Sequence, residues 1–254
     1  MSATRRSVAV AWLALVAAAS AAAAEVQVAV AANFAAPVAR ISEAFKAATG
    51  HTLKVSSGST GKFYSQIVSG APFEVLLAAD DETPRRLAAE GHAVAGTQTT
   101  YAIGRLVLWS ATPGVVDDRG AVLRGAGFRH LAIANPRTAP YGAAALQTLR
   151  GMGLADAVAP KLVTGESIAQ AYQFVVTGNA ELGFVALSQV RAPGKPPQGS
   201  SWLVPANLHD EIRQDAILLK PGERNPAASA LLAFLKSDAA LKILDDFGYG
   251  RPAR

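Results

Sequence analysis

The sequence predicts an α/β protein of two lobes, each a mainly parallel sheet flanked by helices, with a cleft between them. Two observations predict this fold. Short apolar segments of strand length alternate with segments of helical spacing, and the alternation occurs in two groups, with a loop-rich stretch at 112–127 in the second. Alternating strands and helices form parallel sheets with helices on their faces. A chain of 254 residues, half of them hydrophobic, can supply two cores.

The predicted elements follow one another in a regular order. In the first group, an apolar strand precedes an amphipathic helix closed by Gly50, and the strand-turn-helix pattern then repeats twice. Its strands are predicted at 26–31, 52–55 and 73–78, and its helices at 34–49, at 63–68 and at a segment ending with residue 89. The second group has predicted strands at 105–109, 130–134, 161–164 and 182–187 and helices at 143–150 and 166–176. A strand at 215–219 and helices at 226–236 and 238–247 end the chain.

The N-terminus predicts an export signal. Arg5 and Arg6 precede an apolar run at 8–19, and small residues follow up to Ala24. The apolar run is shorter than the ~20 residues of a membrane-spanning helix. We therefore expect residues 1–24 to be a signal peptide cleaved after Ala24, and the mature protein to be free in the periplasm.

Composition excludes several classes of function. Removing 24 of the 254 residues leaves 230, and the loss of Arg5 and Arg6 lowers the formal net charge from +5 to +3. This weak positive charge, without a Lys/Arg-rich run, argues against nucleic acid as a partner. Because the chain has no cysteine, thiol catalysis and thiolate metal sites are excluded. The four histidines are scattered and do not predict a zinc site.

Four strand-to-helix turns share one chemistry. Each begins a helix with a capping residue or a proline, so free backbone N–H groups point along the positive end of a helix dipole. The turns are Ala31–Asn33, Ser57–Gly61, Pro136–Gly142 and Gly165–Ile168. Each turn taken alone is an ordinary helix cap. Together, two from each lobe, they predict a cage of neutral donors for a tetrahedral oxyanion in the cleft.

Enzymatic interpretations of the second turn are weaker. Ser59 and Lys62 match the S-x-x-K motif of serine acyl-enzymes, but the partner motifs S-D-N and K-T-G are absent. A P-loop would need glycine at 56 and Ser or Thr at 63, where the chain has Ser56 and Phe63. The acidic run 80–82 fits a helix cap better than a metal cluster.

The motifs, taken in order, resemble those of the periplasmic molybdate-binding proteins of bacterial ABC transporters. The resemblance covers nearly the whole mature chain. It rests on the segments 31–34, 56–61, 66–67, 70–72, 78–80, 101–104, 106–110, 134–136, 139–142, 182–185 and 247–249.

The resemblance implies a type II periplasmic binding protein fold, with two lobes joined by two hinge strands. We therefore expect residues 25–103 and 214–254 to form lobe 1 and residues 104–213 to form lobe 2. It further implies a monomeric receptor that is not an enzyme. The receptor would bind molybdate or tungstate without a cofactor, a metal cation or a charged side chain, and deliver it to a membrane permease. The alternatives are a binding protein for sulfate, phosphate or another anion, and a serine hydrolase using Ser59 and Lys62.

Residue by residue, the resemblance places the anion donors on six positions. Its first donor falls on Asn33 with the Ala32 backbone beside it, and its second on the Thr60 hydroxyl with Ser59 adjacent. The remaining donors are the backbone N–H groups of Tyr141 and Ile168. Two positions depart from the family. Asn33 stands where many members have serine, and Ala186 stands where some have a tyrosine donor. We expect the Asn33 amide, and the Tyr141 hydroxyl, to be able to compensate, and Lys62 to lie outside the site.

Overall fold

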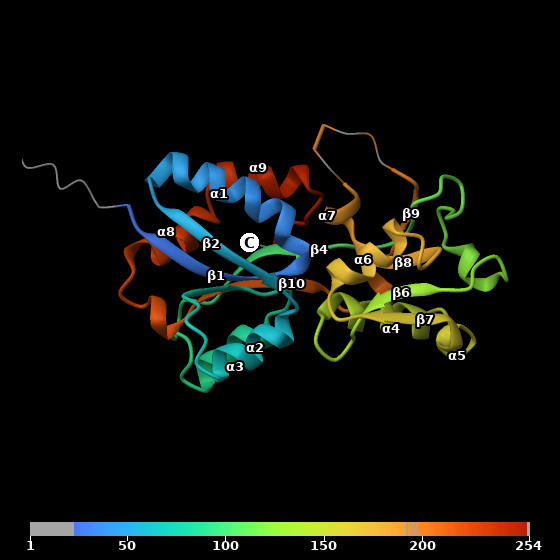
Figure 1. Ribbon diagram of the computed structural model, residues 1–254, viewed down its shortest axis with the longest axis horizontal. Helices are drawn as coiled ribbons and strands as arrows, with labels where there is room; N and C mark the ends of the chain where they lie inside the picture. The colour runs from blue at the N-terminus through green and yellow to red at the C-terminus, as the bar shows by residue number, and fades with distance from the viewer. Residues whose placement is uncertain (1–22, 192, 195, 197, 253–254) are drawn as a thin grey trace, which may run out of the picture.

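The computed structural model describes residues 23–191, 193–194, 196 and 198–252. Within this part of the chain, ten strands form two five-stranded sheets, each at the centre of one lobe (Figure 1). The predicted two-lobed α/β fold is confirmed. Residues 1–22 of the predicted signal peptide lie outside the described residues. Among the helices that are described, none combines the length and apolarity needed to cross a membrane.

The sheet of lobe 1 has the strand order β2-β1-β3-β10-β4. Helices α1, α8 and α9 lie on one face of this sheet, and α2 and α3 lie on the other (Figure 1). The strands are β1 (Glu25–Ala31), β2 (Thr52–Gly58), β3 (Val75–Leu77), β4 (Thr99–Gly104) and β10 (Ile212–Leu218). The helices are α1 (Ala35–Thr49), α2 (Thr60–Val68), α3 (Glu82–Ala89), α8 (Pro226–Phe234) and α9 (Asp238–Asp246), with a 3-10 turn, η1 (Ala32–Phe34), before α1.

The sheet of lobe 2 has the order β7-β6-β8-β5-β9 and repeats this plan. The strands are β5 (Leu106–Ser110), β6 (Leu131–Ala134), β7 (Leu162–Gly165), β8 (Leu182–Ala186) and β9 (Ser200–Leu203). The helices are α4 (Pro140–Gly151), α5 (Ala155–Val158), α6 (Ile168–Val176) and α7 (Leu187–Val190).

The chain passes between the lobes twice, from β4 to β5 across Arg105 and from β9 to β10 through residues 204–211. In each sheet one strand, β10 or β5, runs antiparallel to its two neighbours, while the other four run in one direction. The parallel strands of each sheet end at the edge that faces the cleft. β5 and β10 enter their sheets from the other lobe, so they start at this edge and run in the opposite direction. The sheets are therefore mixed, with four strands parallel.

The pattern of β1 explains why it is central. Val28 and Val30 belong to the buried cluster that holds α1, whereas Ala29 belongs to the cluster on the opposite face, with α2 and α3. Side chains of a strand alternate between faces, so a strand covered by helices on both sides is apolar throughout. The helix expected after it ends at Gly50, whose φ of 77° is left-handed, as a glycine C-cap allows.

Two strands were not expected from the sequence, β4 and β9. Both are edge strands. β4 begins with Thr99 and Thr100, and β9 begins with Ser200 and Ser201, so neither has the continuous apolar run of a buried strand. Edge strands need such a run less, because part of each faces solvent.

Candidate functional site

All six residues predicted to bind the anion line one small cavity between the lobes. Ala32, Asn33, Ser59 and Thr60 come from lobe 1, and Tyr141 and Ile168 come from lobe 2. The cavity volume is about 10 Å³, which is room for about one water molecule. Both lobes therefore enclose a space suited to a small, compact ligand.

The cavity is lined by the first residues of four helical segments. η1 begins at Ala32, α2 at Thr60, α4 at Pro140 and α6 at Ile168. The first N–H groups of a helix have no intrahelical acceptor. Because Pro140 has no N–H, Tyr141 is the first donor of α4. Four positive helix ends thus converge from two lobes, which favours an anion.

No charged side chain lines the cavity within the described part of the chain. The remaining lining residues are Ala31, Gly58, Ala79, Ala139 and Pro140. Negative charge must therefore come from the ligand, and its stabilisation must come from neutral hydrogen-bond donors and helix dipoles.

Among the described residues, the buried Ser59 hydroxyl has no hydrogen-bond partner. Ser59 is 4% exposed and stands at the N-cap of α2, yet its Oγ accepts no capping hydrogen bond. The N–H of Gly61, a usual target of an N-cap oxygen, donates instead to the Thr138 carbonyl at 2.9 Å. An unsatisfied buried hydroxyl costs about 1–3 kcal/mol, so this group is available to a ligand in the cavity and does not cap the helix.

The Thr60 hydroxyl has one partner and one hydrogen left to donate. Thr60 is 1% exposed, and its Oγ1 accepts the Ala79 N–H at 3.0 Å. A hydroxyl that accepts one hydrogen bond still carries its own O–H. Thr60 is therefore fixed in orientation by Ala79 and can donate into the cavity that both residues line.

The Asn33 side chain is used elsewhere. Its Nδ2 donates to the Gln214 Oε1 at 2.9 Å and to the Tyr249 hydroxyl at 3.0 Å, which occupies both amide hydrogens. The Asn33 carbonyl accepts from the hydroxyls of Ser188 and Tyr249. Only the backbone N–H of Asn33 remains for a ligand, so the amide does not compensate for the missing serine.

The Tyr141 hydroxyl is also engaged away from the cavity. It accepts the Gln214 Nε2–H at 3.1 Å. Burial is the main cause that raises the pKa of Tyr141 well above its usual value, and it likewise raises the pKa of Tyr101, which donates to Gln214. These phenols stay neutral. The Tyr141 contribution to the cavity is therefore its backbone N–H, as the resemblance implies.

Sequence reasoning missed this buried hinge network. Gln214, Tyr249, Ser188 and Tyr101 join Asn33 of lobe 1 to α4 and α7 of lobe 2, directly behind the cavity. Gln214 is fully buried on β10, beside a register shift between residues 214 and 215. Because Gln214 stands between Arg213 and Asp215 in β10, no apolar run around it signals its burial. Ala186, the other departure from the family, is fully buried and adds no hydroxyl.

Lys62 lies outside the cavity, as predicted. Its Nζ forms an ion pair with the Glu166 Oε2 at 2.8 Å, and both side chains are at least half exposed. Lys62 lowers the pKa of Glu166 through this hydrogen bond. Because its ammonium is paired with Glu166, Lys62 is not placed as a base for Ser59, and this argues against the serine-hydrolase alternative.

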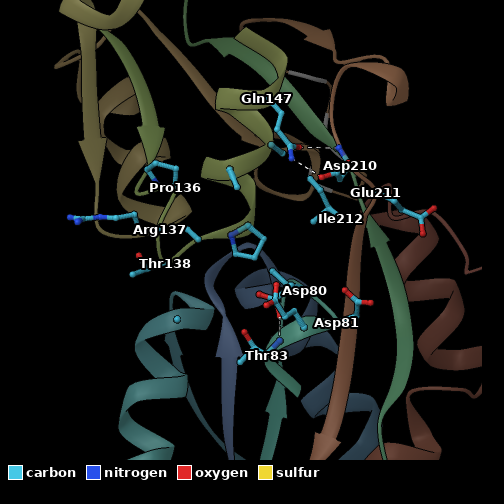
Figure 2. A pocket seen from close by; sticks show the side chains of 17 residues that line it. Asp80, Asp81, Thr83, Pro136, Arg137, Thr138, Gln147, Asp210, Glu211 and Ile212 are labelled. Carbon is cyan, nitrogen blue, oxygen red and sulfur yellow. Dashed lines mark hydrogen bonds between the residues drawn. The ribbon is translucent and has the colours of Figure 1, made fainter. Parts of the chain in front are cut away.

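A second, acidic pocket of about 360 Å³ lies beside the anion cavity, also between the lobes (Figure 2). It is lined by Asp80, Asp81, Glu82, Asp210 and Glu211, with Arg137 opposite. The Asp80 Oδ1 accepts the Thr83 N–H at 2.8 Å, as a capping residue does, and burial raises the pKa of Asp80. Among the described residues, no three acidic or histidine side chains are grouped as metal ligands.

Together, the fold and this site define a two-lobed binding protein that encloses a small anion in its cleft. The chain belongs to the bacterial extracellular solute-binding protein family, whose sequence pattern matches residues 26–250. Members of this family are binding receptors and not enzymes.

Two bacterial molybdate-binding proteins are similar to this chain over nearly its whole length. The chain is 60% identical to the molybdate-binding protein ModA of Azotobacter vinelandii, over 92% of each chain. It is 53% identical to ModA of Rhodobacter capsulatus, over 93% of this chain and 91% of that protein. The predicted resemblance is thus confirmed.

Solved structures agree with the fold. The Azotobacter vinelandii periplasmic molybdate-binding protein superposes with a TM-score of 0.88 at 41% identity, covering 90% of this chain and all of that chain. The sulfate-binding protein SubI from Mycobacterium tuberculosis superposes with a TM-score of 0.71 at 15% identity, over 89% and 86% of the chains, and shows the fold alone.

Proposed function

We propose that this chain is an exported receptor that captures molybdate, and tungstate, in the interlobe cavity and delivers it to an ABC permease. The proposed donors are the backbone N–H groups of Ala32, Asn33, Tyr141 and Ile168 and the hydroxyls of Ser59 and Thr60. The observation that carries the proposal is the buried, unpartnered Ser59 hydroxyl where four helix N-termini meet. The names of the relatives supply the identity of the anion.

Selection among oxyanions would come from the size of the cage. Sulfate has the same charge and shape as molybdate but shorter bonds, so some donors of a cage built for molybdate would be left without an acceptor. Each unmet buried donor costs about 1–3 kcal/mol, which corresponds to a discrimination of roughly 5-fold to 150-fold for one donor and more for two.

Calorimetry with molybdate, tungstate, sulfate and phosphate on the anion-free mature protein tests this function. We expect tight binding of molybdate and tungstate, and weak binding of the other two. Sulfate bound as tightly as molybdate would make the chain a general oxyanion receptor. No heat with any of the four would overturn the receptor assignment.

We further propose that the mature protein is a periplasmic monomer that begins at Glu25. The first strand, β1, starts at this residue. Mass spectrometry of the exported protein should give a chain of residues 25–254, and light scattering a single copy. A retained N-terminal segment would overturn the proposed cleavage.

A further inference from the structure

The two residues that follow Ser59 and Thr60 both reach across the cleft. The Gly61 N–H donates to the Thr138 carbonyl at 2.9 Å, and the Lys62 ammonium pairs with Glu166 at 2.8 Å. Figure 2 shows Thr138 on the loop of lobe 2 above the first turn of α2. These contacts join the lobes on the side of the cleft away from the hinge network.

Gly61 is required by the closeness of this contact. A Cβ at position 61 would lie 3.0 Å from the Thr138 Cα and 3.2 Å from both its Cβ and its carbonyl oxygen. The backbone of Gly61 does not have the left-handed conformation that would itself demand glycine. In the second position of a helix, alanine is otherwise the better residue. Only the closed lobes therefore exclude a side chain here.

The partners in lobe 2 lie next to the proposed anion donors. Thr138 precedes Pro140 and Tyr141, and Glu166 precedes Ile168. The contacts of Gly61 and Lys62 can thus form only when the donors of lobe 2 have come up to Ser59 and Thr60. Closure also changes the hydrogen bonding of the Ser59 hydroxyl. The Gly61 N–H, which this hydroxyl would accept as an N-cap, donates to the Thr138 carbonyl instead.

We propose that Gly61, Lys62, Thr138 and Glu166 form an interlobe clasp that stabilises the closed lobes and, by taking the Gly61 N–H, frees the Ser59 hydroxyl for the anion. This inference rests on the proposed function. The clasp residues are positioning residues: they act through the population of the closed state, and the apparent affinity of a receptor scales with that population. The Gly61–Thr138 contact carries most of the effect, because the Lys62–Glu166 pair is exposed and screened by salt.

The test compares Gly61→Ala with Gly127→Ala, a matched control at an open position whose added Cβ meets no atom within 4 Å. Because the chain has no cysteine, Lys46→Cys in lobe 1 and Asp156→Cys in lobe 2 accept a fluorophore pair that reports the distance between lobes. We expect Gly61→Ala to melt at or above the native temperature when anion-free, to bind molybdate at least 10-fold more weakly, and to close less fully at saturating molybdate. Gly127→Ala should match the native protein in all three.

Lys62→Gln tests the ion pair separately. Its dissociation rate for molybdate should rise about two- to five-fold at low salt and match the native rate at 1 M salt. A Gly61→Ala protein that closes fully and keeps the native dissociation constant would overturn the clasp. If the native protein binds no molybdate, the proposed function fails, and the clasp is then tested by the distance between the lobes in the anion-free proteins. Gly61→Ala should increase this distance. An unchanged distance would refute the clasp.

Discussion

Replacing Ser59 by alanine isolates one proposed donor with little cost to the fold. The Ser59 hydroxyl is buried in the closed structure and has no hydrogen-bond partner in the part of the chain that the structure describes. Its removal therefore breaks no hydrogen bond there, and in an open state it removes at most one helix cap, worth about 1 kcal/mol. A loss of this size lowers the melting temperature of a protein of this length by about 2–4 °C.

The effect on binding should be much larger. A hydrogen bond to a charged group contributes about 1.5–3 kcal/mol, and 1.36 kcal/mol corresponds to a factor of ten. Ser59→Ala should therefore raise the molybdate dissociation constant by roughly 10-fold to 150-fold. The expected result is a variant that is nearly as stable as the native protein when empty but gains less thermal stability from saturating molybdate.

Titration calorimetry on anion-free protein measures this constant, with Ser229→Ala as the control. Ser229 is an exposed serine of α8 in lobe 1, so its removal changes the same atoms away from the cleft. A dissociation constant for Ser59→Ala within two-fold of the native value would refute the placement of the anion beside Ser59.

Three further predictions concern groups around the cavity. Thr60→Val should weaken molybdate binding by about 10-fold or more, measured by calorimetry. It should also lower the melting temperature of the anion-free protein, because the Ala79 N–H loses its acceptor. A native melting temperature would contradict the role of the Thr60–Ala79 hydrogen bond. Gln214→Leu should lower the free energy of unfolding by about 2–3 kcal/mol, measured in urea, since Asn33 and Tyr141 lose buried partners. The raised pKa of Asp80 means that its ionised carboxylate lowers the free energy of unfolding. This loss of stability is complete above the pKa of Asp80 in the folded protein and absent below its pKa in the unfolded chain. Asp80→Asn should therefore melt higher than the native protein at pH 7, and the difference should shrink as the pH falls towards 4; a difference that does not change with pH would contradict this.

The sequence predicted the fold well where local patterns decide it. Strand-turn-helix units are set by apolar runs, helical spacing and terminal residues such as Gly50, all of which are local. The edge strands β4 and β9 escaped prediction because each begins with two hydroxyl residues and is only partly buried, which weakens the apolar signal. The reversed directions of β5 and β10 also escaped it, since strand direction depends on which lobe the chain arrives from.

The lining of the candidate cavity was predicted in composition but not in detail. The six lining residues follow from four turns and a family resemblance, and the cavity brings them together. The direction of the Asn33 side chain could not be predicted, because it is set by Gln214 and Tyr249, each more than 180 residues away. The release of Ser59 from capping likewise depends on a contact between lobes, which no local pattern records.

The position of β10 in the sheet has a consequence for how the protein is made. β10 lies between β3 and β4, so the sheet of lobe 1 stays divided until residues 212–218 have been synthesised. Lobe 2 is contiguous in sequence and has all its strands earlier. Because long-range strand pairing is slow and domains fold as units, we expect a nascent chain to fold lobe 2 first and lobe 1 last. The anion cavity, which needs both, would be the last feature of the molecule to assemble.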